Sequence, residues 1–187
     1  LRYLIDAFAE NCADPLAPPD EDVYFIPVSI VYDQQHEVEA ISFEDAVRLV
    51  NKRGRYMQDA VPVGTGRMIA VLGKEVSQLQ AAIDANTAGV AEIANINAPG
   101  QIVIAGSVEG VSGFIEKLGA AKFIDLPVSA PFHCGLMKPA EEKLRVDLKN
   151  IQINQPKFPV YQNFTAAWSE DPETIRENLA LHVCGRV

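Results

Sequence analysis

The sequence has few cysteines, few basic residues relative to acidic ones, and no long apolar run. Its 187 residues include three widely spaced cysteines, an odd number that fits neither a disulfide framework nor a cysteine metal site. Sixteen Lys and Arg residues against 25 Asp and Glu give a formal net charge of −9, which argues against nucleic-acid binding. No segment approaches the roughly 18 apolar residues of a transmembrane helix. We therefore expect a globular protein without a membrane span.

Two sequence motifs of active sites are also missing. The Gly-x-Ser-x-Gly elbow, which presents a nucleophilic serine, does not occur. The nearest string, Gly110-Val-Ser-Gly113, lies inside a predicted helix. Gly64-Thr-Gly66 lacks the third glycine of a dinucleotide fingerprint and precedes a strand rather than a helix. The sequence thus predicts no serine nucleophile, no cofactor and no metal.

What the chain does contain is a regular alternation of strand and helix patterns. A helical period over Leu1–Asn11 is followed by a strand pattern over Val23–Tyr32. Ser42-Phe-Glu-Asp45 resembles a capping box and predicts a helix to about Gln58. The segment after it predicts six elements in the order β-α-β-β-α-β, which is typical of a ferredoxin-like unit. Their ranges are Arg67–Leu72, Val76–Asn86, Val90–Ile96, Gln101–Gly106, Ser107–Leu118 and Lys122–Pro127.

Three elements are predicted after this unit. Cys134–Asn150 is expected to be a helix, and Pro156–Asn163 a strand that returns to a larger sheet. Asp171 is expected to cap a last helix that runs to about His182. The fold class is therefore α/β.

His133 is the best candidate for chemistry, because it follows an apolar strand in the turn Pro127–Met137. Pro131 restricts the backbone there, and a histidine at a strand end can act as a general base near neutral pH. The alternative is a histidine whose nitrogens are satisfied by backbone groups at a turn. Cys134 is a poor partner for it, since neighbouring side chains diverge at the start of a helix.

Arg53 is the second candidate, because the helical spacing places it and Met57 near the apolar face while Lys52 and Arg55 point outward. A buried guanidinium needs an anion, which a ligand or an ordinary internal ion pair can supply. Taken alone, the ion pair is the better interpretation. Asn97, at a turn after a strand, can orient a ligand, although turn formation explains it as well. His36 and His182 are interpreted as surface residues.

Residues from about Ile41 to Val187 resemble the malonyl-CoA:acyl-carrier-protein transacylases of fatty acid synthesis. The strings that carry the resemblance are SFEDAVRLVNKRGRYMQ (42–58), AVPVGTG (60–66), NINAPGQIVIAG (95–106) and LPVSAPFHCGLMKP (126–139). The resemblance implies a fragment of a hydrolase-like α/β subdomain, residues 41–63 and 128–187, with a complete ferredoxin-like subdomain, 64–127, inserted in it.

This resemblance also implies roles for the candidate residues. In the family, a serine takes malonyl from coenzyme A and passes it to the phosphopantetheine thiol of acyl carrier protein. His133 would activate that serine and then the thiol. Arg53 would pair with the malonyl carboxylate and so select malonyl over acetyl, while Met57 would line the same pocket and Asn97 would contact the substrate. The implied partners are malonyl-CoA and acyl carrier protein.

The sequence also departs from the family in several segments. The Gly-Gln-Gly-Ser-Gln segment, the serine elbow and the C-terminal glutamine region that orients the histidine are not found, so we expect this chain to be inactive alone. Residues 1–40 differ in origin: Leu1–Phe8 and Asp22–Asp33 resemble membrane-associated bacterial-type glycerol-3-phosphate acyltransferases, without their His-x4-Asp motif. The join near 38–41 indicates a fusion or a mistaken gene model.

Two further functions stay open on these grounds, a glycerol-3-phosphate acyltransferase fragment and a non-catalytic carrier-binding module. We expect the protein in the cytoplasm, or in a plastid or mitochondrion if the source is eukaryotic.

Overall fold

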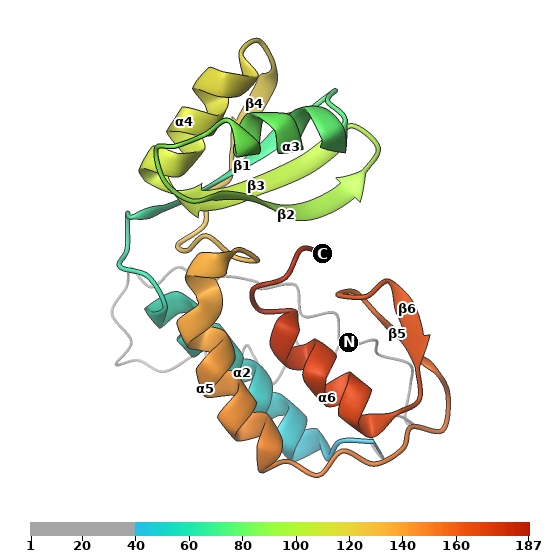
Figure 1. Cartoon of the computed structure of the whole chain (residues 1–187). Coiled ribbons are helices and arrows are strands. Elements are labelled where there is room, and N and C mark those ends of the chain that lie inside the picture. The colour runs from blue at the N-terminus through green and yellow to red at the C-terminus, as the bar shows by residue number, and fades with distance from the viewer. Residues whose placement is uncertain (1–39) are drawn as a thin grey trace.

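The structure is a computed structural model that describes residues 40–187 (Figure 1). The predicted helix Leu1–Asn11 and strand Val23–Tyr32 lie outside the described residues. The first described element is helix α2 (Phe43–Asp59), which begins where the capping sequence predicts. Ser42 Oγ accepts a hydrogen bond from the Asp45 amide at 3.1 Å, which satisfies one free N–H of the first turn.

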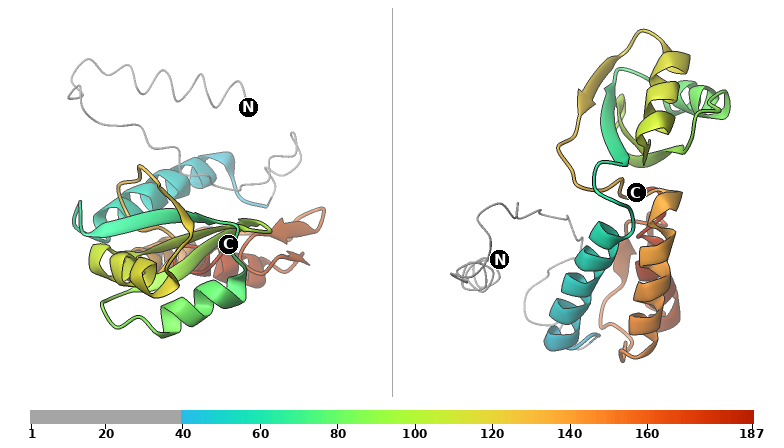
Figure 2. Two further views of the ribbon diagram at one scale, coloured as in Figure 1. Left: turned by 90° about the horizontal axis from the view of Figure 1, so that it is seen from above. Right: turned by 90° about the vertical axis from the view of Figure 1, so that its left-hand side faces the viewer.

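The central element is a four-stranded antiparallel sheet. Its strands are β1 (Gly66–Leu72), β2 (Ala91–Ala98), β3 (Gln101–Ser107) and β4 (Lys122–Asp125), in the spatial order β2-β3-β1-β4. Helices α3 (Val76–Asp84) and α4 (Val108–Leu118) cover one face of it (Figure 2). The predicted β-α-β-β-α-β order is confirmed, although α3 ends two residues early and β4 stops at Asp125 instead of Pro127.

The two central strands, β1 and β3, are buried on both faces of the sheet, because their residues are apolar on both sides. One face packs against α3 and α4, with Ile69, Ile104 and Phe114 fully buried. The opposite face, which includes Met68 and Ala105, packs against Cys134 and its neighbours. The segment predicted to carry the site thus covers the second face of the sheet.

The remaining helices form a separate layer below the sheet (Figure 1). A short 3₁₀ turn, η2 (Gly135–Met137), leads into α5 (Lys138–Lys149), which packs against α2 and against α6 (Pro172–Leu181). The layer's core is made of apolar residues from all three helices and the loops between them: Leu49, Met57, Ala130, Met137, Ala140, Leu144, Leu148, Ile153, Ala180 and Val183.

The prediction that a helix begins at Cys134 is wrong. Cys134 has an extended backbone, and the α-helix begins only at Lys138. The Cys134 thiol donates to the Pro131 carbonyl at 3.0 Å, a local contact of the turn that replaces a helical hydrogen bond. Pro139 then occupies the first turn of α5, where a missing N–H costs nothing.

The prediction that Pro156–Asn163 returns to a larger sheet is also wrong for the residues described. Only Val160–Gln162 forms a strand, β5, and it pairs antiparallel with β6 (Ala167–Ser169) in a two-stranded hairpin. The facing rings of Tyr161 and Trp168 meet edge to face, with centroids 4.9 Å apart. Such cross-strand aromatic pairs stabilise a hairpin locally, without a larger sheet.

The last helix confirms its predicted cap. The Asp171 carboxylate accepts from the Thr174 amide at 2.7 Å, and α6 ends at Leu181, one residue before the predicted end. Across residues 40–187, no helix has the length and apolarity needed to cross a membrane.

We expect Gly110→Ala in α4 to lower the free energy of unfolding by about 1–3 kcal/mol. A Cβ at this position would lie 2.0 Å from the Val90 carbonyl oxygen, so the helix would have to move away from the sheet. Chemical denaturation measures the effect. The control is Glu116→Ala on the exposed side of α4. Helix propensity alone would make Gly110→Ala stabilising by about 1 kcal/mol, and that sign would contradict the close approach.

Candidate functional site

The turn that carries His133 is held from both sides. Ala130 and Met137 are buried in the core of the helical layer, while Cys134 is buried against the sheet. Glu92 on β2 accepts a hydrogen bond from the Gly135 amide at 2.9 Å. Pro131 lies so close to Gly66 that a Cβ on Gly66 would be 2.3 Å from the proline ring. The turn is therefore fixed where the two layers meet.

His133 has a left-handed backbone, with φ of 59°, which is uncommon for a residue with a side chain. Its Nδ1 lies 2.9 Å from the main-chain oxygen of His182. Because a carbonyl can only accept, Nδ1 carries the hydrogen and the lone pair of the neutral ring is on Nε2. This is the tautomer that a general base requires, with Nε2 ready to take a proton.

The protonation state of His133 fits that role. The pKa of His133 is lowered from 6.5 to about 4, chiefly by burial and also by the charge of Arg53, while the carbonyls of His182 and Gly185 oppose the shift. The ring is thus neutral at pH 7. The interpretation as a turn histidine satisfied by backbone groups is supported as well, by the His182 carbonyl at Nδ1 and by the Gly185 carbonyl.

Arg53 is buried on the face of α2 that the spacing predicts, with 6% of its surface exposed. Its Nη1 and Nη2 atoms are both buried without a hydrogen-bond partner in the described part of the chain. No ion pair involves it there, so the interpretation as an ordinary internal ion pair is wrong for residues 40–187. Desolvation lowers the pKa of Arg53 to about 10, so the group remains a cation at pH 7.

The residues around Arg53 lie as predicted. Met57, one turn further along α2, is completely buried in the helical core. Lys52 points outward and pairs with Asp147 on α5 at 2.6 Å, and Arg55 is exposed. Only one of the three basic residues on this stretch of helix is therefore turned inward.

His182 is a site residue that the sequence interpretation missed. It was expected at the surface, but its ring is largely buried, with its centroid 5.1 Å from that of His133 and the planes tilted by 32°. Burial lowers the pKa of His182 to about 3, and the charges of Arg53 and His133 add to the effect. The spacing Ile175, Asn178, His182 on the buried side of α6 is the signal that would have found it.

The position of His182 also corrects the expectation that the group orienting His133 is missing. That group is the His182 carbonyl just after α6, and any residue type offers such a carbonyl. A search for a glutamine motif therefore cannot detect it.

Two other candidates, Asn97 and Cys134, have side chains in different surroundings. Asn97 is exposed at the end of β2, between the two residues Ile96 and Ala98 where the β2–β3 register shifts. Its predicted contact with substrate stays a prediction. Cys134 is buried, and desolvation raises the pKa of its thiol to about 11, so it is protonated and unsuited to nucleophilic attack.

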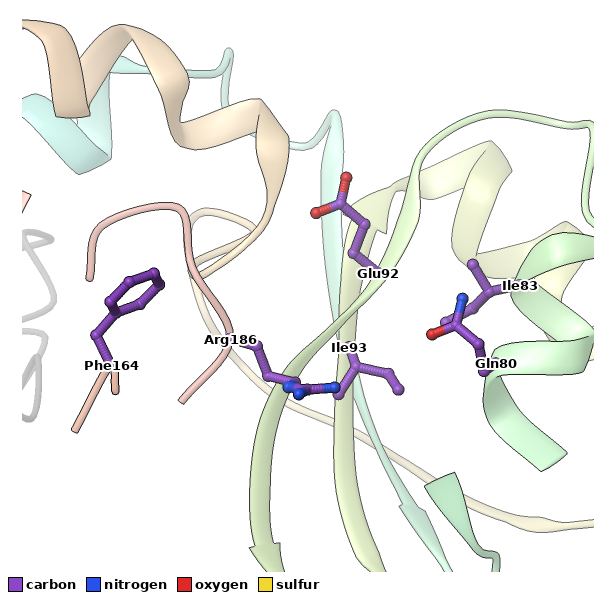
Figure 3. Close-up of a pocket in the computed structure, with 6 residues that line it drawn as sticks. All are labelled: Gln80, Ile83, Glu92, Ile93, Phe164 and Arg186. Atoms are coloured by element: carbon purple, nitrogen blue, oxygen red, sulfur yellow. The ribbon is translucent and has the colours of Figure 1, made fainter. Parts of the chain in front are cut away.

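A cavity of about 410 Å³ lies between α3, β2 and the C-terminal segment (Figure 3). Residues 186–187 run beside β2, where the Val187 amide donates to the Ala94 carbonyl at 2.9 Å. None of the predicted site residues lines the cavity, which is bounded by Gln80, Ile83, Glu92, Ile93, Phe164 and Arg186. Within residues 40–187 no group of three or more His, Cys, Asp or Glu side chains is arranged to hold a metal.

Comparison with known proteins gives a consistent result. The family model of the acyl transferase domain matches residues 35–182. The malonyl CoA-acyl carrier protein transacylase of Salmonella typhimurium is 43% identical over 143 residues, which are 74% of this chain and 46% of that protein. The chain thus spans about half the length of the curated relatives it matches.

Solved structures agree in fold. The malonyl CoA-acyl carrier protein transacylase of Clostridium perfringens superposes with a TM-score of 0.74 at 41% identity, covering 81% of this chain and 49% of that one. A malonyl-transacylase in complex with its type II polyketide-synthase acyl-carrier protein gives 0.76 at 38% identity, covering 81% and 51%. The α/β fold class is confirmed by these similarities.

We expect the imidazole NMR resonances of His133 and His182 to show no titration midpoint above about pH 5, because burial disfavours both imidazolium forms. In the same chain unfolded in urea, the midpoints should lie near 6.5. A folded-state midpoint near 6.5 for His133 would contradict the buried, neutral base.

The same shifts predict how stability depends on pH. Below pH 6.5 the unfolded chain takes up protons on these histidines, whereas the folded chain does not until about pH 4. The free energy of unfolding should therefore fall as the pH falls from 6.5 toward 4, by up to about 1.4 kcal/mol per pH unit for each histidine. Denaturation of His133→Asn should show a shallower decline over this range.

Proposed function

Because the chain belongs to the acyl transferase domain family, we propose that it forms the base and the carboxylate-binding part of a malonyl-CoA:acyl-carrier-protein transacylase of fatty acid synthesis. The observation that carries the proposal is the buried guanidinium of Arg53, which has no partner on Nη1 or Nη2 and whose charge acts on the neutral, oriented His133. A cation in this state fits a substrate that brings its own carboxylate.

The proposed chemistry is acyl transfer in two half-reactions. His133 Nε2 takes the proton of a serine hydroxyl as the serine oxygen attacks the thioester carbonyl of malonyl-CoA, and the departing coenzyme A thiolate receives that proton. The thiol of acyl carrier protein then gives its proton to His133 and attacks the acyl-serine, whose oxygen leaves and takes the proton back. The His182 carbonyl holds the ring in the tautomer that both steps need.

The serine of this scheme comes from a segment outside these residues, because the 187 residues contain no Gly-x-Ser-x-Gly. The proposed role of this chain is thus to position the base and to choose the acyl group.

In this proposal, Arg53 determines which acyl group binds. A guanidinium binds a carboxylate through two parallel hydrogen bonds, and Nη1 and Nη2 are the two unused donors here. Acetyl-CoA has no carboxylate and would leave the cation buried and unpaired. Met57 would form an apolar wall of the same pocket, and Asn97 would contact the more distant part of the substrate.

The proposed division into subdomains rests on the separate cores. Residues 41–63 and 128–187 contribute the helical core, and 64–127 contribute the sheet with α3 and α4. We propose that they correspond to a partial large acyltransferase subdomain and an inserted ferredoxin-like one. The origin of residues 1–40 and the cytoplasmic location stay predictions.

We expect Arg53→Gln to weaken malonyl-CoA binding by roughly tenfold or more, because a hydrogen-bonded ion pair is lost. Acetyl-CoA binding should change little. Isothermal titration calorimetry of both ligands measures the difference, and Arg55→Gln on the exposed face of α2 is the matched control. Equal losses for both ligands would contradict a carboxylate-binding role.

Removing the same charge should stabilise the chain when no ligand is bound. We expect Arg53→Met to raise the free energy of unfolding by about 1–4 kcal/mol, because an apolar side chain fits the buried position better than an unpaired cation. A fall in stability would indicate that Arg53 is paired within the protein.

The missing elbow has a direct chemical consequence. After incubation with radiolabelled malonyl-CoA, we expect this chain to carry no covalent malonyl group by intact-mass measurement. A serine-linked adduct would contradict the proposal that the nucleophile lies elsewhere.

A pull-down with acyl carrier protein tests the alternative function. If the carrier is retained while no transfer occurs and Arg53→Gln has no selective effect, the results favour a non-catalytic carrier-binding module.

A further inference from the structure

The side chain of His182 has no role in the mechanism above, which uses only its main-chain carbonyl. The ring is largely buried, and within residues 40–187 no hydrogen bond joins either ring nitrogen to another group. The ring nitrogens are not among the fully buried polar atoms that lack a partner, which are Nη1 and Nη2 of Arg53 and Nε2 of Gln162. An accessible imidazole N–H without a partner can donate to a group that arrives from outside the chain.

Its surroundings indicate which kind of partner that is. The ring lies against His133, at 5.1 Å between centroids, and the charge of Arg53 acts on both imidazoles. No carboxylate among residues 40–187 is hydrogen-bonded to Nη1 or Nη2 of Arg53. The local field therefore favours an anion.

We propose that the His182 side chain is a specificity-determining residue that donates a hydrogen bond to the same ligand carboxylate as Arg53. This inference rests on the proposed function and adds a second donor to its acyl-binding site. A carboxylate has about four lone-pair positions, and a bidentate guanidinium uses two, so an N–H donor from a different helix can use a third. Arg53 on α2 and His182 just after α6 would then hold the carboxylate from two sides.

This arrangement also explains why the donor is a histidine next to the base. The neutral ring offers one N–H without adding a second full charge, so it does not repel protons from His133 as a lysine or arginine would. The ring face packs against His133 at the same time. One residue thus orients the base through its carbonyl and would bind the acyl group through its side chain.

Two variants separate hydrogen bonding from packing. His182→Phe keeps an aromatic ring beside His133 but removes the N–H donor. His182→Gln keeps an N–H donor but removes the ring. Both leave the main-chain carbonyl in place, so the His133 Nδ1 resonance serves as a control for an intact turn.

Malonate is the first probe, because it carries the carboxylate without coenzyme A. Titration into the ¹⁵N-labelled chain should shift the ring nitrogens of His182 and the guanidinium of Arg53 with one saturation curve. His182→Phe should raise the Kd for malonate by roughly tenfold, and His182→Gln should stay within about threefold of the wild type.

Three results would overturn the inference: no saturable shift of the His182 ring, an unchanged Kd in His182→Phe, or a His182→Gln that binds as weakly as a folded His182→Phe. If His182→Phe does not fold, the wild-type ring shift and His182→Gln decide. Calorimetry with malonyl-CoA and acetyl-CoA tests the proposed function separately. Malonate bound by both residues without preference for malonyl-CoA would retain this inference and reject the transacylase assignment.

Discussion

The structure depends on one short segment that belongs to two hydrophobic cores. Between residues 130 and 137 the chain buries Ala130 and Met137 among the helices and Cys134 against the sheet. Neither core can be completed without this segment, so its backbone cannot move independently of either. That constraint holds His133 at a φ of 59°, a conformation that an unrestrained turn would leave.

The second feature of the site is that one buried charged side chain is paired and another is not. Glu141 on α5 is 1% exposed, and its carboxylate is paired with both Lys138, at 2.8 Å, and Arg145, at 2.7 Å. Arg53 is almost as buried, but its Nη1 and Nη2 have no partner in the described chain. Stability alone would favour pairing or replacing such a cation, and this cost is the reason for the proposal that a ligand supplies its partner.

The sequence patterns predicted most of the fold because they report on local structure. Ser42 and Asp171 indicated helix starts by capping. The alternating strand and helix patterns of residues 66–125 predicted the right order of these elements. The errors came at Cys134, where contacts distant in sequence decided the outcome, and before Asn163, where a local hairpin forms in place of the expected larger sheet. The helix expected from Cys134 begins later because the turn is held against Gly66 and the sheet, and the strand before Asn163 pairs within its own hairpin.

The sequence by itself determined that Arg53 and Met57 face inward on an amphipathic helix and that His133 lies in a proline-bounded turn, since periodicity and proline geometry act within a few residues. Only the tertiary structure decided what those side chains meet. His133 is oriented by a carbonyl 49 residues away, and the lack of a partner on the Arg53 guanidinium shows only once the helices are packed. A backbone carbonyl leaves no signature in the residue type, so only the fold shows that His182 orients His133 and lies beside it.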